Sequence, residues 1–283
     1  MKRILAPILL LTLLFPALAF GEQYDDLVKR DGLYYKKRTD VPFTGKTTGV
    51  YQGSFRNGKK YGPWVQYYYD GQLRTKGTHK DGERDGPWIQ YWDNGQLRTK
   101  GIYKDGERDG PWVQYWDNGQ LYYKGIYKDG KEDGPWVKYY DNGQLYYKGT
   151  YKDDKEDGPW VSYYSDGTVN EKRTGTFKNG MLDGPYVTYW DNGQLRTRGT
   201  YKDGERDGPW VQYWWDNGQL YYKGTYKNGK EDGPWITYHD NGQLESKGTY
   251  KNGKEDGPWV GFLQDGTVNE ESTGTFKNGV KVK

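Results

Sequence analysis

Aromatic and polar residues alternate along most of the chain in a pattern that recurs about every 24 residues. In one copy, residues 136–140 (WVKYY) and 145–151 (LYYKGTY) form two alternating runs, separated by Asp141-Asn142-Gly143. Alternation with a period of two predicts β-strands. Asn-Gly between two strands favours a two-residue type I′ turn, because both central residues need positive φ. Each repeat is therefore predicted to be a β-hairpin followed by a return loop, without a helix.

The tripeptide Gly-Pro-Trp opens each repeat and defines the period. A proline just before a strand removes a backbone N–H where the sheet needs it least. A fixed period of this length is typical of repeat architectures. Tyr186 takes the place of Trp in a ninth copy. The nine glycines of this motif are Gly62, Gly86, Gly110, Gly134, Gly158, Gly184, Gly208, Gly233 and Gly257.

The turn type determines which side chains share a face of the sheet. A two-residue turn places Trp136 opposite Gly149, so that the ring can lie across the glycine. A three-residue Asp-Asn-Gly loop would shift the register by one and place Trp136 opposite Lys148; we prefer the first register. One predicted face then carries Trp136, Tyr140, Leu145, Tyr147 and Tyr151, and the opposite, wetter face carries Val137, Tyr139, Tyr146, Lys148 and Lys152.

The first residues of the chain are typical of a secretory signal peptide. Lys2 and Arg3 precede an apolar run, which ends in the small-residue cleavage motif Ala17-Leu18-Ala19. We therefore assign residues 1–19 to a signal peptide that is cleaved near Ala19. The protein is expected to be exported and to be periplasmic or secreted.

The remaining chain divides into a cap and the repeats. Residues 20–60 are predicted to form an N-terminal cap, which contains a hairpin about Asp31-Gly32 and a degenerate repeat, because a solenoid needs an atypical end to cover its first strand. Residues 61–283 hold the tandem repeats. Residues 165–177 and 264–276 are near-copies of one another, and each is two residues longer than the standard hairpin.

The composition indicates a sheet that is held together by aromatic rings. Aromatic residues make up 18% of the chain, whereas Leu, Ile and Val are few. Stacked Trp and Tyr, each burying roughly 150–250 Å², must replace an aliphatic core. The predicted fold is all-β: an elongated, single-layer, twisted antiparallel sheet built from tandem hairpins, in the manner of a solenoid.

Charge and cysteine content exclude several classes of function. Without Lys2 and Arg3 the basic and acidic side chains nearly balance, which argues against nucleic-acid binding and against a polybasic membrane patch. The chain has no cysteine, so it has neither disulfides nor thiolate metal sites.

The candidate catalytic residues are better explained as parts of the repeat. His79 stands where other repeats have Tyr103, and His239 stands where they have Trp116. The loop at 105–110 could suggest calcium, but it lacks the alternating acidic spacing of an EF-hand, and turn formation explains it. We expect no catalytic residue, no metal site and no cofactor, and therefore no enzyme.

The aromatic ladder is the one feature that could bind a partner. Most of its rings are expected to form the core, and part of one face is expected to be an exposed groove, because solenoids present extended surfaces to their partners. The candidate binding residues are Trp88, Trp112, Trp136, Trp160, Trp210 and Trp235.

The repeat resembles the bacterial variant of the MORN repeat (membrane occupation and recognition nexus). The resemblance rests on Gly-x-Tyr-Lys-Asp-Gly-Lys-x-x-Gly-Pro-Trp together with Asp-Asn-Gly-Gln-Leu. The segment at 25–45 is similar to the start of YwqK-like antitoxins. The resemblance implies an elongated single-layer antiparallel sheet and a non-enzymatic scaffold that binds a protein partner, such as a toxin. Binding of carbohydrate or cell wall through aromatic repeats is the alternative, and binding of membrane lipid is a second one.

Overall fold

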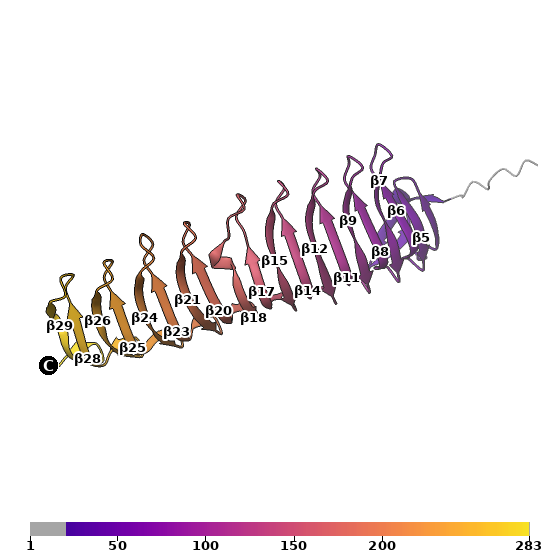
Figure 1. Ribbon diagram of the computed structural model, residues 1–283. Coiled ribbons are helices and arrows are strands. Elements are labelled where there is room, and N and C mark those ends of the chain that lie inside the picture. The colour runs from indigo at the N-terminus through magenta and orange to yellow at the C-terminus, as the bar shows by residue number, and fades with distance from the viewer. Residues whose placement is uncertain (1–20, 283) are drawn as a thin grey trace, which may run out of the picture. The chain divides into compact units, whose positions relative to one another are not determined.

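The computed structural model describes residues 21–282 and shows an all-β protein of successive hairpins (Figure 1). The predicted all-β fold is confirmed: the strands form long antiparallel ladders, and the described residues contain no α-helix. The predicted signal peptide lies outside the described residues. The chain forms two compact units, which are described separately: among the described residues, unit 1 holds 21–97 with 103–107, and unit 2 holds 98–102 with 108–282.

Unit 1 contains the predicted cap and the first repeats. The cap hairpin has the predicted turn, since Asp31 and Gly32 have φ values of 46° and 80°. β1 pairs in parallel with β4 and so covers an edge of the antiparallel ladder β4 to β8. The elements are β1 (Glu22–Gln23), the 3₁₀ turn η1 (Tyr24–Asp26), β2 (Leu27–Arg30), β3 (Leu33–Lys36), β4 (Gly45–Thr48), β5 (Tyr51–Arg56), β6 (Lys59–Tyr67), β7 (Leu73–Lys80) and β8 (Glu83–Tyr91).

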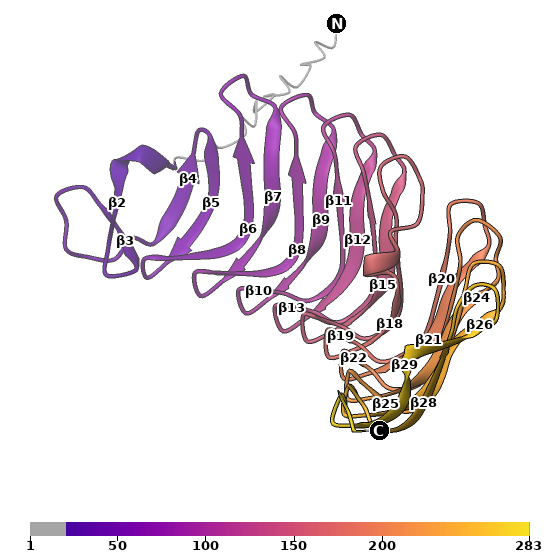
Figure 2. The same ribbon diagram turned by 90° about the vertical axis from the view of Figure 1, so that its left-hand side faces the viewer.

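Unit 2 repeats the same hairpin, and in Figure 2 its return turns lie along one side of the strands and its hairpin turns along the other. Its strands are β9 (Leu97–Lys104), β10 (Glu107–Arg108), β11 (Gly110–Tyr115), β12 (Leu121–Lys128), β13 (Lys131–Glu132), β14 (Gly134–Tyr139), β15 (Leu145–Lys152), β16 (Lys155–Glu156), β17 (Gly158–Ser162), β18 (Gly175–Lys178), β19 (Met181–Leu182), β20 (Gly184–Tyr189), β21 (Leu195–Lys202), β22 (Glu205–Arg206), β23 (Gly208–Tyr213), β24 (Leu220–Lys227), β25 (Lys230–Tyr238), β26 (Leu244–Lys251), β27 (Lys254–Glu255), β28 (Gly257–Phe262), β29 (Val268–Lys277) and β30 (Val280–Lys281). β9 begins in unit 1.

The Asp-Asn-Gly turn differs from its prediction. Tyr140 N donates to Gln144 O at 2.8 Å and Gly143 N donates to Tyr140 O at 3.0 Å. Gly143 has a φ of 83°, whereas Asn142 keeps a negative φ. The loop is therefore the three-residue type, a type I turn followed by a left-handed glycine. The type I′ turns occur instead in the return loops, as at Asp153 and Asp154, whose φ values are 49° and 64°.

A β-bulge beside this turn keeps the preferred register. Lys138 pairs with Tyr147, but the next pair toward the turn is Tyr139 with Leu145, so that Tyr146 is the extra residue. The bulge cancels the one-residue shift that the three-residue loop introduces. Trp136 therefore lies opposite Gly149, as predicted, although the turn assignment was wrong.

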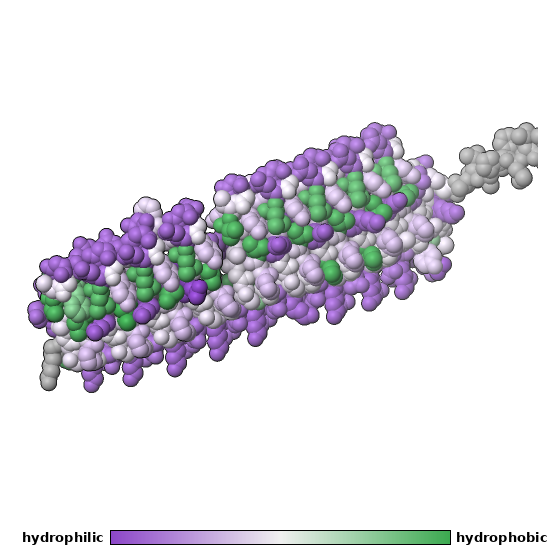
Figure 3. All heavy atoms as spheres, in the orientation of Figure 1, coloured by the Kyte–Doolittle hydropathy of each residue, from purple (hydrophilic) through white to green (hydrophobic). Residues whose placement is uncertain are grey.

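The bulge also changes the two faces of the hairpin. Tyr146 lies on the aromatic face, where its ring contacts those of Tyr140 at 4.7 Å and Tyr147 at 5.2 Å. Leu145 pairs with Tyr139 and so lies on the opposite face. Both positions correct the predicted faces. In Figure 3 the apolar residues form a stripe in each unit, bounded by the hydrophilic turns.

Each tryptophan covers a glycine, but that glycine belongs to the preceding hairpin. A Cβ on Gly149 would lie 1.8 Å from the Trp160 ring, and a Cβ on Gly125 would lie 2.2 Å from the Trp136 ring. The Trp136 indole N–H donates to Ile126 O at 3.1 Å, which holds the ring over the preceding strand. The predicted cover of Gly149 by Trp136 is therefore corrected: Trp160 covers this glycine, and each tryptophan joins two repeats.

The two longer segments have different backbones. Residues 165–177 include the 3₁₀ turn η2 (Glu171–Arg173), and the ladder of β17 to β19 ends there. Residues 264–276 enter the continuous strand β29. In both, a threonine hydroxyl accepts a backbone N–H of the neighbouring strand: Ser162 N to Thr174 Oγ1 and Gly261 N to Thr273 Oγ1, each at 3.0 Å. The hairpin repeat continues after both segments, but the hydrogen-bonded sheet is interrupted between β19 and β20.

Candidate binding surface

One half-buried position of the repeat changes its charge along unit 2, and the exposed residue before it changes in the opposite sense, from Glu107 beside Arg108 to Lys131 beside Glu132. We call the half-buried position the variable row, and it lies three residues before each Pro of the Gly-Pro motif. Backbone hydrogen bonds join the row to the next return turn, from Gly130 N to Arg108 O at 3.0 Å and from Asp154 N to Glu132 O at 2.9 Å. The side chains are half-buried. In unit 2 the row consists of Arg108, Glu132, Glu156, Leu182, Arg206, Glu231 and Glu255.

The variable row belongs to the aromatic face. Glu132 pairs with Tyr127, and Glu156 pairs with Tyr151. Opposed residues of paired strands project to the same side of a sheet. The rings of Trp136 and Tyr151 lie 5.8 Å apart on that side. The charged groups therefore lie along one edge of the aromatic ladder, next to the return turns.

The basic members of the row rest on rings. The Arg108 guanidinium lies 4.6 Å from the Trp112 ring centroid and 5.0 Å from that of Tyr127, and its Nη1 donates to Tyr127 Oη at 2.7 Å. Arg206 repeats this arrangement over Trp210 and Tyr226. Such cation–π contacts contribute on the order of 0.5–1 kcal/mol when partly exposed. They hold the charge in one place without neutralising it.

The acidic members lie in a less favourable environment. Burial raises the pKa of Glu132 above its ordinary value, and the neighbouring charge of Asp154 raises it further. Burial also raises the pKa of Glu156. Next to them, the Lys138 ammonium lies 4.9 Å from the Tyr122 ring centroid and 5.5 Å from that of Tyr146. Unit 2 thus presents half-buried charges of both signs in a fixed order.

The six tryptophans of the predicted binding ladder form the core of the aromatic face. Each is buried, with exposed fractions between 2% at Trp210 and 7% at Trp235. Tyr151 and Trp160 pack edge to face at 4.9 Å, which continues the ladder from one repeat to the next. Their indole faces are therefore covered within the chain, whereas the variable row and tyrosines such as Tyr147 and Tyr151 are partly exposed. A contact between these six residues and a partner stays a prediction. The set is Trp88, Trp112, Trp136, Trp160, Trp210 and Trp235.

A second ladder, which the sequence analysis did not single out, lies beside the hairpin turns. Tyr140 Oη donates to Tyr163 O at 3.0 Å, in the next repeat. His239 Nε2 makes the equivalent contact with Phe262 O at 2.9 Å. His239 thus occupies the repeated aromatic position, as predicted. The signal for this ladder was present, since an aromatic residue precedes most Asp-Asn-Gly turns.

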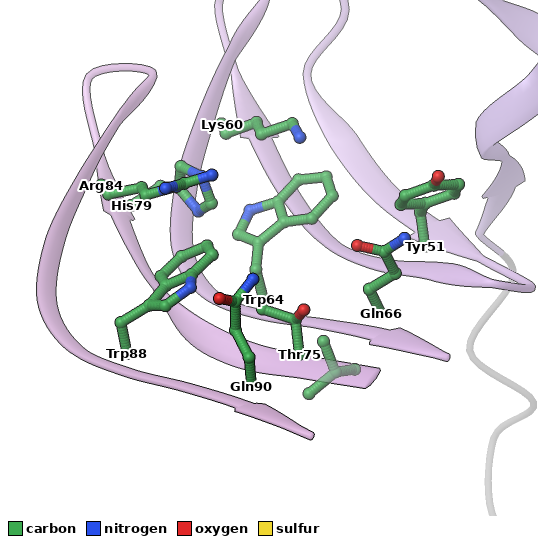
Figure 4. A pocket seen from close by; sticks show the side chains of 10 residues that line it. Tyr51, Lys60, Trp64, Gln66, Thr75, His79, Arg84, Trp88 and Gln90 are labelled. Carbon is green, nitrogen blue, oxygen red and sulfur yellow. The ribbon is translucent and has the colours of Figure 1, made fainter. Parts of the chain in front are cut away.

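Unit 1 contains a pocket of about 140 Å³ between two tryptophans (Figure 4). Its lining includes Lys60, Trp64, His79, Arg84 and Trp88. The His79 ring packs edge to face on Trp64 at 5.6 Å and on Trp88 at 5.5 Å, in the place of a repeat tyrosine, as predicted. Burial, together with the charges of Lys60 and Arg84, lowers the pKa of His79 to about 4.

Unit 2 contains a more open hollow of about 510 Å³ near its C-terminal repeats. Its lining includes Trp235, His239, Glu245, Glu255 and Trp259 and contains no Lys or Arg. The hollow is therefore acidic, although its walls are the same tryptophan and tyrosine positions that line the pocket of unit 1.

Between residues 21 and 282, no three His, Asp or Glu side chains are placed to hold a metal ion. No helix of this same part of the chain has the length and apolar character needed to cross a membrane.

Comparison with protein families gives one match. The family described as "MORN repeat variant" matches seven segments, which together cover more than half of the chain. They are residues 60–81, 84–105, 108–129, 132–153, 182–203, 211–228 and 231–252. No curated protein matches the chain.

Proposed function

Because the chain belongs to the family of MORN repeat variants, we propose that it is a non-enzymatic scaffold whose aromatic face binds a protein partner. The observation that carries this proposal is the variable row of unit 2. Its half-buried charges change from basic to acidic and back, while the tryptophans beside them recur in nearly every repeat. A surface with a fixed order of charges complements an irregular polymer such as a polypeptide.

The structure gives less support to carbohydrate binding. A glycan of identical sugars needs identical subsites, and stacking on a sugar needs an open ring face. The variable row differs from repeat to repeat, and the tryptophans are buried. No observation of the described residues favours membrane-lipid binding over a protein partner.

The finer form of the proposal concerns location and partner. Residues 1–19 support export, and the resemblance to YwqK-like antitoxins supports a toxin as the partner, with the chain as its antitoxin or immunity protein. Export is tested by determining the N-terminal residue of the protein recovered outside the cytoplasm. A chain that keeps Met1 and stays in the cytoplasm would contradict export but not the binding scaffold.

The test of the scaffold is partner capture with matched variants. The whole chain is used to capture proteins from the source cells, and the affinity of each captured protein is measured for Glu132→Gln, for Arg206→Gln and for the double variant. We expect the double variant to lose at least tenfold in affinity, about 1.4 kcal/mol. Lys148→Gln is the control, because it removes an exposed charge from the opposite face of the same repeat.

Two results would overturn the scaffold proposal. One is a captured partner that binds the double variant as tightly as the wild type. The other is tighter binding to insoluble glycan than to any protein, which would favour the carbohydrate alternative.

A further inference from the structure

The pocket of unit 1 contains two cations that no carboxylate neutralises. Among residues 21–282, neither Lys60 nor Arg84 is part of an ion pair. Their neighbours are rings instead: the Lys60 ammonium lies 4.5 Å from the Trp64 ring centroid, and the Arg84 guanidinium lies 4.5 Å from that of Trp88. Arg84 Nη1 donates to the neutral hydroxyl of Tyr103 at 2.7 Å. Positive charge is therefore concentrated here and left uncompensated.

The neighbouring polar groups add unpaired nitrogens without a counter-charge. The buried Nε1 of Trp88 and the buried Nδ1 of His79 have no hydrogen-bond partner. Gln66 and Gln90 also line the pocket, and its lining contains no Asp or Glu. Buried polar groups are nearly always paired, so unpaired ones at a pocket indicate a group that is supplied from outside.

Burial and repulsion make the Lys60 ammonium costly in the free protein. Burial lowers the pKa of the Lys60 ammonium, and the charges of Arg84 and Lys29 lower it further. The charges of Lys60 and Arg84 also lower the pKa of His79 in the pocket. A bound anion would relieve this repulsion, which makes the site selective for negative charge.

We propose that the pocket between Trp64 and Trp88 binds a carboxylate side chain of an acidic peptide segment through Lys60 and Arg84. In Figure 4, Lys60 lies over Trp64, and Arg84 lies beside His79 above Trp88. The volume of about 140 Å³ suits a single acidic side chain. The inference rests on the proposed function, since the carboxylate would belong to the protein partner, and it assigns that partner an acidic residue.

The test uses tetraglutamate peptide as the probe and the whole chain as the receptor. Binding is measured by calorimetry for the wild type and for Lys60→Gln, Arg84→Gln and Lys76→Gln. Lys76 is the matched control: it lies on β7 between Thr75 and Gly77, is exposed, and points to the opposite face because its neighbour Thr75 lines the pocket. We expect Lys60→Gln and Arg84→Gln each to weaken binding at least tenfold, and Lys76→Gln to change it less than twofold.

A second readout uses His79 as a reporter. The chain has two histidines, so in a His239→Trp variant the remaining imidazole signal in NMR belongs to His79. Bound carboxylate should raise the pKa of His79 from about 4 toward the ordinary histidine value. Tetraglutamine should leave it unchanged. Thermal melting shows whether each variant is folded. If Lys60→Gln is unfolded, Lys60→Met takes its place, because the methionine side chain keeps the packing on Trp64.

Three other outcomes of these experiments would contradict the inference. Equal loss in Lys76→Gln and Lys60→Gln would show only a general attraction between charges. Tighter binding of inorganic phosphate or of a uronic-acid tetrasaccharide than of tetraglutamate would assign the pocket to another ligand. No binding of tetraglutamate together with normal partner capture would refute the pocket and leave the proposed scaffold standing, because that test relies on Glu132 and Arg206 in unit 2.

Discussion

The pocket around His79 in unit 1 and the hollow around His239 in unit 2 are built from the same repeat and carry opposite charges. Arg84 and Glu255 occupy the same repeat position, three residues before the Pro of the Gly-Pro motif. One lies over a tryptophan in a basic pocket, and the other lines a hollow without Lys or Arg. The rings and turns form a constant frame, and a few positions beside the rings give each region its chemistry.

This division between frame and charge has a consequence for mutations. Substitutions in the frame should lower stability in both regions to a similar extent. Substitutions in the variable row should change binding or pH dependence and leave the fold intact. The predictions below concern the frame, including His79, whereas the binding tests proposed above concern the variable row.

The largest effect is expected from removing a tryptophan of the frame. Trp88→Ala and Trp259→Ala should each cost about 3–5 kcal/mol in the free energy of unfolding, because both rings are buried and would leave a cavity. Chemical unfolding of the whole chain measures the loss. Tyr69→Ala is the control, because Tyr69 is fully exposed. A cost near zero at either tryptophan would contradict the shared frame.

A smaller loss is expected at the glycines beneath the rings. A Cβ on Gly77 would lie 2.0 Å from the Trp88 ring, so Gly77→Ala should cost about 1–3 kcal/mol through overpacking. A double-mutant cycle identifies the ring concerned. Gly77→Ala should cost almost nothing in a Trp88→Ala background and its full amount in a Trp64→Ala background. The reverse result would mean that each ring covers the glycine of its own hairpin.

The two histidines should differ in their effect on acid stability. The pKa of His79 is lowered to about 4, so between pH 6.5 and pH 4 the unfolded chain binds more protons than the folded one. This contribution to stability is complete above pH 6.5 and is lost as the pH falls to 4. His79 is only half-buried, so we expect on the order of 1 kcal/mol after solvent screening. His79→Tyr should remove this part of the acid dependence, and melting temperatures between pH 4 and 7 measure it.

The matched control is His239→Trp, which replaces the other histidine by the tryptophan that several repeats have at this position. This variant keeps His79, and it should keep the wild-type change in stability between pH 6.5 and pH 4. A wild-type acid dependence in His79→Tyr would show that His79 is not the group responsible.

The repeat, the strands and the pairing of Trp136 with Gly149 could be predicted from the sequence, because they follow from alternation and period. The turn could not, because Asn-Gly is compatible with two loop lengths, and a bulge at Tyr146 restores the same register. The pocket around Lys60 was also missed. The sequence shows a basic residue beside Gly-Pro-Trp. Only the positions of the neighbouring strands show that no carboxylate pairs with it.

The smallest predicted effect comes from the turn asparagines, whose role the structure revises. Asn241 Oδ1 accepts the backbone N–H of Gln243 at 3.0 Å, and its Nδ2 donates to Gln264 O in the next repeat at 3.1 Å. The asparagine therefore joins neighbouring turns and does not serve to supply a positive φ. Asp70 occupies this position in unit 1 and accepts from Gln72 N at 2.9 Å, but a carboxylate cannot donate.

Replacing each of these residues by the type found at the other position isolates the hydrogen bond between neighbouring turns. Asn241→Asp should lose one exposed hydrogen bond and cost about 0.5–1.5 kcal/mol, whereas Asp70→Asn gains a donor and should stabilise by a similar or smaller amount. Asn241→Gly removes both contacts and adds chain entropy, so it should cost more than Asn241→Asp. All three are measured by chemical unfolding against the wild type. A type I′ turn would accept glycine at this position without loss, so an Asn241→Gly variant as stable as the wild type would restore the turn that the sequence favoured.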